Sequence, residues 1–179
     1  MRAAVAVVGM GGIGKTTLAR QYVRRHRSEY SGGIWWLSVP SLVTQVLDYT
    51  ERSVGLGELP SEWSEEQVVQ YCFNLWETEF PTRKLFVLDG GVKDYKALKP
   101  FLPIQGYFQV LMTTRVRIQR PITCLCLDVL GPSTAMNLLQ QLMSDDARLE
   151  EDLAAAEELC DWLGYLPLGI ELIGRYLSE

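Results

Sequence analysis

Eight residues near the N-terminus limit the possible folds of this chain more than any other feature. Residues 9–16 read Gly-Met-Gly-Gly-Ile-Gly-Lys-Thr, which matches the pattern G-x-x-x-x-G-K-[ST]. An unbroken apolar run at residues 3–8 precedes this pattern, and a segment of helical composition at residues 16–27 follows it. A strand, a glycine loop and a helix in this order form the context in which the pattern binds phosphate groups.

The residue types of this loop suit the chemistry of a nucleoside triphosphate. Glycines let backbone N–H groups turn towards phosphate oxygens, because side chains would block that approach. Lys15 adds a positive charge for the β- and γ-phosphates, and the Thr16 hydroxyl can ligate Mg²⁺. The predicted nucleotide-binding residues of the loop are Gly11, Gly12, Ile13, Gly14, Lys15, Thr16 and Thr17.

Length and composition bound the remaining possibilities. With 179 residues, of which 47% are hydrophobic, the chain can bury one α/β core with a small appendage. The net charge of −5 argues against a general nucleic-acid interface. No apolar stretch approaches the roughly 20 residues of a membrane span, and the N-terminus lacks the layout of a signal peptide. We therefore expect a cytoplasmic protein that binds neither nucleic acid nor membrane.

Hydrophobic patterning predicts a parallel sheet flanked by helices and followed by a purely helical segment. Strands after the first are predicted at residues 34–39, 85–88, 108–113 and 123–127. Helices are predicted at residues 42–52, 65–79, 133–143, 149–163 and 168–177. Strands alternate with helices only up to about residue 130, which favours a parallel sheet over that range. The predicted fold class is α/β, with a P-loop nucleotide-binding domain at residues 1–130 and a small helical subdomain at residues 131–179.

Two polar residues follow predicted strands at the edge where open α/β sheets bind ligands. Asp89 comes directly after residues 85–88, and Arg115 follows the strand at residues 108–113. We predict that Asp89 holds the hydration shell of Mg²⁺ and that Arg115 reaches the γ-phosphate. An aspartate that caps a turn and a surface salt bridge are the respective alternatives. Lys15, Asp89 and Arg115 are thus the candidate catalytic groups, and Thr16 and Asp89 are the candidate metal ligands.

Five segments together resemble the NB-ARC family of the STAND class of signal-transduction ATPases. They are the loop at residues 9–19, Trp-Trp-Leu-Ser-Val at residues 35–39, Arg-Lys-Leu-Phe-Val-Leu-Asp at residues 83–89, Leu-Met-Thr-Thr-Arg at residues 111–115, and Leu-Gly-Tyr-Leu-Pro-Leu at residues 163–168. The resemblance covers essentially the whole chain and implies bound ATP or ADP with Mg²⁺. It also implies that residues 131–179 are ARC1-like and that Pro167 packs on the adenine ring. An ordinary helix-start proline is the alternative, and both can be true.

The resemblance further implies a molecular switch. ADP would hold the helical subdomain closed on the sheet, and exchange for ATP would let the full-length protein open and form a homo-oligomer. The chain ends at Glu179, before the winged-helix domain of the family, and no sensor or effector domain is visible. These absent domains are the expected partners within the full-length protein.

Two departures from the family pattern limit what the resemblance implies. The family usually has two acidic residues after the third strand, whereas Asp89 is followed here by Gly90 and Gly91. We therefore expect slow or negligible hydrolysis, because a positioned general base contributes roughly 100- to 10,000-fold. Tyr165 stands two residues before Pro167, where the family often has glycine. The geometry of the adenine contact is consequently open.

Two other functions compete with the switch. The first is an active ATPase whose water-activating carboxylate comes from elsewhere, such as Asp94 or Glu58. The second is a nucleotide-binding interaction scaffold, although Lys15, Thr16 and Asp89 are all present. Multiple turnover by the pure chain would favour the first, and failure of any nucleotide to raise the melting temperature would favour the second.

Overall fold

The computed structural model describes residues 4–103, 106–119, 122–143 and 152–178. The predicted strand residue Ala3 and the predicted helix start at residues 149–151 lie outside these ranges. The chain divides into two compact units, each described here by itself. The sheet unit comprises Met1–Val8 and Thr16–Leu125, and the helical unit comprises Gly9–Lys15 and Cys126–Glu179.

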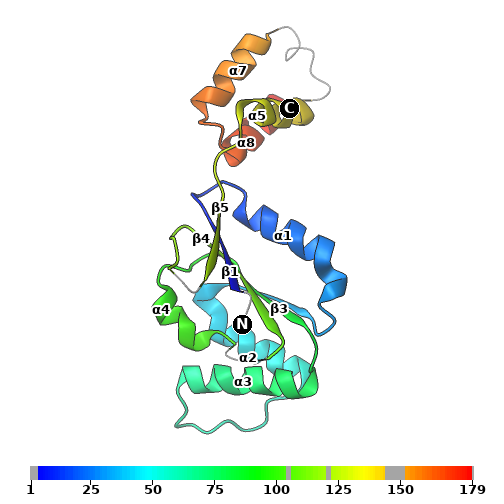
Figure 1. The fold of residues 1–179 in the computed structure, drawn as a ribbon, viewed down its shortest axis with the longest axis vertical. Coiled ribbons are helices and arrows are strands. Elements are labelled where there is room, and N and C mark those ends of the chain that lie inside the picture. The colour runs from blue at the N-terminus through cyan, green and yellow to red at the C-terminus, as the bar shows by residue number, and fades with distance from the viewer. Residues whose placement is uncertain (1–3, 104–105, 120–121, 144–151, 179) are drawn as a thin grey trace. The chain divides into compact units, whose positions relative to one another are not determined.

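A five-stranded sheet with the order β2-β3-β4-β1-β5 forms the centre of the sheet unit. The strands are β1 (Ala4–Val8), β2 (Ile34–Leu37), β3 (Lys84–Leu88), β4 (Phe108–Thr114) and β5 (Thr123–Cys126). β1 pairs with β4, β2 with β3, and β3 with β4, all in parallel. Every residue of β3 is buried, as expected of a strand covered on both faces. The predicted α/β fold with a parallel sheet is confirmed (Figure 1).

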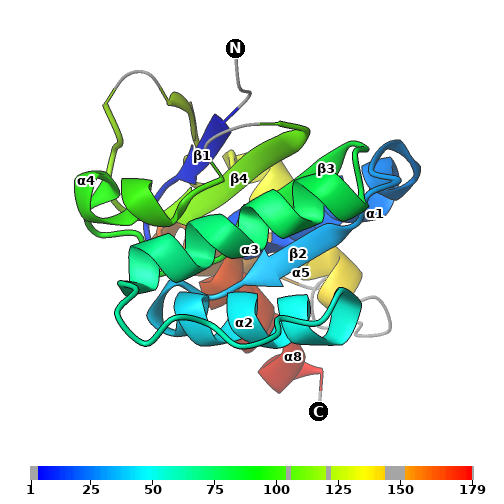
Figure 2. The ribbon, with the colours of Figure 1, turned by 90° about the horizontal axis from the view of Figure 1, so that it is seen from below.

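Within the described ranges, four α-helices connect these strands. They are α1 (Lys15–His26), α2 (Leu42–Ser53), α3 (Glu65–Glu79) and α4 (Tyr95–Leu98). Short 3₁₀ turns occur at η1 (Arg27–Glu29), η2 (Val39–Ser41) and η3 (Lys99–Phe101). A capping box marks the start of α3. The side chains of Ser64 and Gln67 each accept a hydrogen bond from the backbone N–H of the other residue. α2 and α3 run side by side, as Figures 1 and 2 both show.

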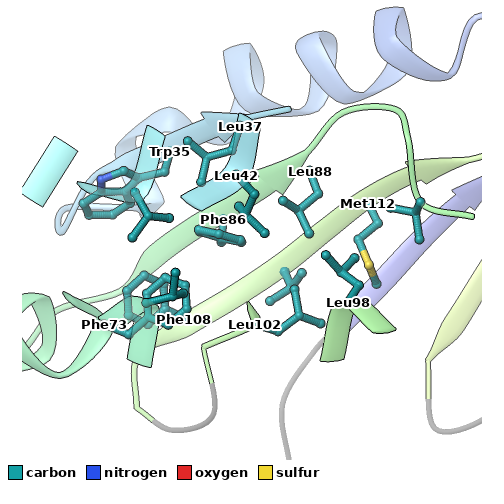
Figure 3. Close-up of a cluster of buried hydrophobic side chains, with 14 of the residues drawn as sticks. Trp35, Leu37, Leu42, Phe73, Phe86, Leu88, Leu98, Leu102, Phe108 and Met112 are labelled. Carbon is teal, nitrogen blue, oxygen red and sulfur yellow. The ribbon is translucent and has the colours of Figure 1, made fainter. Parts of the chain in front are cut away.

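The main core lies on the face of the sheet that α2, α3 and α4 cover (Figure 3). Phe108, Val110 and Met112 of β4 point into it because alternate residues of a strand face the same side. The fully buried Trp76 of α3 stacks on Trp35 of β2, with 4.9 Å between ring centroids. Successive aromatic rings thus fix how α3 sits on the strands that end at the candidate site.

The opposite face of the sheet carries a small polar contact beside α1. Gln109 alternates with the core residues of β4, and its amide lies 2.9 Å from the hydroxyl of Tyr30. That hydroxyl is 2.6 Å from the hydroxyl of Tyr22 on α1. Burial and the bond to Tyr22 raise the pKa of Tyr30 well above its usual value. This face is therefore covered by the helix that leaves the glycine loop.

In its described residues, the helical unit contains three helices around a core of its own. They are α5 (Pro132–Leu142), α7 (Leu153–Trp162) and α8 (Pro167–Leu177). Their shared core is formed by Ala135, Leu139, Met143, Ala156, Cys160 and Ile170. The unit also takes in the loop Gly9–Lys15, so it is not the same set of residues as the subdomain predicted at residues 131–179. That boundary stays a prediction.

Among the residues described, none of the helices combines the length and the apolar character that a membrane span requires.

Candidate nucleotide-binding site

The glycine loop of the helical unit adopts a conformation that side chains would not allow. Gly12 and Gly14 have φ values of 76° and 97°, in the left-handed region that favours glycine. A Cβ atom on Gly12 would also lie 3.0 Å from the Cβ of Leu168. A Cβ on Gly9 would lie 3.0 Å from the carbonyl oxygen of Leu127. The predicted Gly12 and Gly14 are thus favoured by the backbone conformation, and Gly9 and Gly12 by their close neighbours.

Lys15 folds back onto this loop. Its ammonium group donates to the carbonyl oxygens of Gly9, at 2.9 Å, and Met10, at 2.6 Å. The half-buried side chain is therefore held at the loop by two backbone carbonyl oxygens.

The start of α8 contacts the same loop within the helical unit. The backbone N–H of Leu168 donates to the carbonyl oxygen of Gly12 over 3.2 Å. Pro167 occupies the first turn of α8, where its missing N–H costs nothing. The structure therefore brings the Pro167 segment to the loop, a contact that the sequence analysis did not foresee.

Tyr165 explains why the family pattern favours glycine two residues before the proline. Its φ is 55°, and in the described part of the chain it is the one non-glycine residue with a positive φ. Gly164 before it has a φ of 60°. The turn is fixed because Tyr165 donates its N–H to the carbonyl of Cys160 and accepts from the N–H of Leu130. A left-handed tyrosine costs about 1–2 kcal/mol, which glycine would avoid.

The Asp89 carboxylate connects α1 to β4 through hydrogen bonds with two threonine hydroxyls. Its Oδ1 accepts from the Thr16 hydroxyl at 2.8 Å and from the Thr113 hydroxyl at 2.6 Å. The Thr113 hydroxyl in turn accepts from the N–H of Gly90 at 2.8 Å. Thr16 and Asp89, the two predicted metal ligands, thus come together and offer only oxygen atoms, which suits Mg²⁺.

Thr113 is a site residue that the sequence analysis missed. The pairing of Leu88 with Met112 places Thr113 opposite Asp89 on the neighbouring strand. The sequence does show a hydroxyl residue at the end of a predicted strand. However, the strand order that makes Thr113 a neighbour of Asp89 cannot be derived from a single sequence.

Arg115 follows β4 and is exposed to solvent. No described acidic side chain forms an ion pair with it, so the salt-bridge alternative is not formed within the described ranges. The preceding Thr114 donates its hydroxyl to the carbonyl of Val92 at 2.7 Å and accepts from the N–H of Val116 at 3.0 Å. The backbone on both sides of Arg115 is therefore tied to the loop that follows Asp89.

That loop carries glycines where a second carboxylate would stand. Gly90 and Gly91 have φ values of 73° and 79°. A Cβ on Gly91 would lie 3.1 Å from the Cβ of Val39, whereas a Cβ on Gly90 would meet no atom within 4 Å. Asp94 was a candidate for the missing water-activating carboxylate. Its carboxylate accepts a hydrogen bond from the N–H of Lys96 at the start of α4. Position 90 is consequently open in space but holds no acid.

Comparison with known proteins settles the family. The family model of the NB-ARC domain matches residues 1–149. The chain belongs to the NB-ARC family. Disease resistance RPP8-like protein 3 of Arabidopsis thaliana is 31% identical to it over 193 residues, which cover 98% of this chain and 20% of that protein. Regulatory protein AfsR of Streptomyces coelicolor is 26% identical over 97% of the chain and 18% of its own length. The NB-ARC chain thus spans about one-fifth of these relatives.

Solved structures share the fold of this NB-ARC domain at low sequence identity. A STAND protein with a tetratricopeptide repeat sensor from Pyrococcus horikoshii has a TM-score of 0.54 at 20% identity, covering 97% of this chain and 27% of its own. Cdc6p from Pyrobaculum aerophilum has a TM-score of 0.59 at 11% identity, covering 76% of this chain and 41% of its own. At these identities the likeness concerns the fold.

Replacing Thr113 by valine is expected to weaken ADP binding in the presence of Mg²⁺ by roughly tenfold, because hydrogen bonds to charged groups contribute about 1.5–3 kcal/mol. Valine has nearly the same shape but cannot hold the Asp89 carboxylate in place. Thr113→Ser keeps the hydroxyl and should bind like the parent. Calorimetric titrations with ADP in Mg²⁺ and in EDTA would show whether the loss of affinity depends on the metal ion. An equal loss in both media would mean that Thr113 does not act through the metal ligand.

Proposed function

We propose that this NB-ARC domain is an ATP- and ADP-binding molecular switch with slow hydrolysis. The observation that carries the proposal is the hydrogen bond between the N–H of Leu168 and the carbonyl of Gly12. It connects the helix that begins at Pro167 to the loop whose residue types suit phosphate binding. A ligand in that loop is thereby able to influence the helical subdomain.

The binding half of the switch rests on the loop and on the two oxygen ligands. Backbone N–H groups of the glycine loop and the Lys15 ammonium would surround the phosphates. Thr16 and Asp89 would hold Mg²⁺ or its hydration shell, and the ion would offset negative charge on the phosphates. Pro167 would pack on the adenine ring from the start of α8.

The switching half needs a group that distinguishes ATP from ADP. We assign that role to Arg115, which is exposed and has no described acidic partner. Loss of the γ-phosphate would remove its contact and change the relative stability of two subdomain arrangements. In the full-length, cytoplasmic protein, the ATP form would open and oligomerise, with winged-helix, sensor and effector domains supplying signal and output. The relatives named for disease resistance support such a signalling role.

Hydrolysis is proposed to be slow because nothing at position 90 can activate water. The Asp89 carboxylate already accepts from two threonine hydroxyls, which leaves it suited to metal binding rather than to proton transfer. The exposed Asp94 carboxylate caps α4 and is committed to a backbone N–H.

Replacing Gly90 by aspartate is expected to raise the rate of ATP hydrolysis at least tenfold, since a positioned general base contributes roughly 100- to 10,000-fold. Position 90 has free space for a side chain, and aspartate tolerates its left-handed conformation better than most residues. Gly90→Asn is the matched control, because it carries similar strain without a base. Release of inorganic phosphate measures both rates, and equal rates for the two variants would contradict this role of position 90.

Calorimetric titration of nucleotide-free protein with Mg²⁺ and either ADP or ATP tests the proposal as a whole. Two different affinities, with turnover well below the median enzyme rate of about 10 per second, are expected of a switch. Fast multiple turnover would instead make the chain an ATPase with another water-activating residue.

A further inference from the structure

A cationic pocket in the sheet unit is not used by the proposed nucleotide site. Its volume is about 620 Å³, and it lies between α4 and the segment that follows β4. Its cationic lining residues are Lys93, Lys96, Lys99 and Arg117. Val92, Tyr95 and Ile118 supply apolar surface. Four positive charges around one pocket are unexpected in a chain with a net charge of −5.

These cations have no acidic partner in the part of the chain that the structure describes. None of the four forms an ion pair there. The acidic residue of the pocket lining is Asp94, whose carboxylate accepts from the backbone N–H of Lys96 at 2.8 Å and caps α4. Neighbouring like charges repel one another, so a ligand with several carboxylates would be stabilised in this pocket.

The walls of the pocket belong to the two segments that leave the nucleotide site. Val92 lies three residues after Asp89, and Val116 directly follows Arg115. The Thr114 hydroxyl joins both segments, since it donates to the carbonyl of Val92 and accepts from the N–H of Val116. An occupant of the pocket would therefore contact the same backbone that carries the proposed metal ligand and γ-phosphate sensor.

The helical unit presents a surface of matching chemistry on α7. Ala156 and Cys160 of this helix are buried in the core of the unit, while Glu157, Glu158 and Asp161 are exposed. Trp162, at the end of the helix, is 79% exposed. An exposed tryptophan beside three carboxylates combines an apolar anchor with negative charge, and tryptophan is the residue type most enriched among binding hot spots.

We propose that the cationic pocket of one copy binds the acidic end of α7 from a second copy. Trp162 would lie over the apolar surface near Tyr95, and the α7 carboxylates would face the lysines and Arg117. The pocket and α7 are different surfaces of the same chain, so the contact is head-to-tail and can continue into a ring or filament. This inference rests on the oligomerisation part of the proposed function and names the surfaces that carry it.

Two charge-reversed variants test this contact. The pocket variant carries Lys96→Glu and Arg117→Glu, and the helix variant carries Glu157→Lys and Asp161→Lys. Each alone places like charges on both sides of the contact, whereas a mixture restores opposite charges at both types of junction. Sedimentation velocity with saturating ADP or a non-hydrolysable ATP analogue would measure association. Arg52→Glu, a charge reversal at an exposed position of α2, is the control.

The parent chain and the control should self-associate with at least one nucleotide, and each charge-reversed variant should do so at least tenfold more weakly. The equimolar mixture should recover the parent affinity. A parent chain that stays monomeric with both nucleotides would overturn the proposal, as would unchanged association of the variants or a mixture that does not recover. ADP affinity measured on the same samples keeps this outcome separate from a failure of nucleotide binding.

Discussion

Replacing Lys15 by alanine is expected to weaken the binding of both ADP and ATP by about 100-fold or more. The ammonium group is held at the loop by the carbonyls of Gly9 and Met10, where it would instead bind phosphate oxygens. Hydrogen bonds between charged partners contribute about 1.5–3 kcal/mol each, and tenfold in affinity corresponds to about 1.4 kcal/mol. Since the loop conformation depends on its glycines, the variant should remain folded.

Calorimetry with each nucleotide and a melting curve of the free variant would check this prediction. Arg52→Ala removes an exposed cation from α2 and should leave both affinities unchanged. If the Lys15 variant binds ADP as tightly as the parent, the phosphates do not occupy the glycine loop.

Replacing Lys84 by alanine is expected to lower the free energy of unfolding by about 3–5 kcal/mol, the cost of breaking a buried ion pair. The Lys84 side chain is fully buried, and its ammonium lies 3.5 Å from the carboxylate of Glu77. It donates to the carbonyls of Phe80 and Thr82 and lies 5.0 Å from the ring of Phe108. Alanine would remove the positive charge beside Glu77 and the ammonium donor of both carbonyls, although Glu77 would keep the N–H of Tyr107 and Phe80 that of Thr82.

Burial lowers the pKa of the Lys84 ammonium, while the neighbouring Glu77 opposes that shift. Urea unfolding of Lys84→Ala and of Lys96→Ala would measure the effect, and the exposed Lys96 should contribute less than about 0.5 kcal/mol. A loss below about 1 kcal/mol in the Lys84 variant would show that the ammonium does not organise the α3–β3 turn.

The sequence predicted regular elements well where one local rule dominated. α3 has the predicted bounds, because a capping box and an apolar face both mark its start. β2 ends at Leu37 rather than at residue 39, since Pro40 favours the short turn Val39–Ser41. α4 was missed because a four-residue helix shows no periodicity.

The candidate site was predictable in its parts but not in its connections. The motif alone indicated Lys15 and Thr16, and the end of an apolar strand indicated Asp89. The bond between Thr113 and Asp89 depends on strand order, which a single chain does not reveal. The contact of α8 with the loop depends on how helices pack around residues far apart in sequence.

The most direct test of the switch compares the NB-ARC domain saturated with Mg²⁺·ADP and with a magnesium complex of a non-hydrolysable ATP analogue, by calorimetry and by small-angle X-ray scattering. Because a ligand shifts an equilibrium only by its differential affinity for the two states, the two observations must agree. The proposed switch predicts different affinities together with different scattering profiles. Equal affinities and superimposable profiles would contradict it.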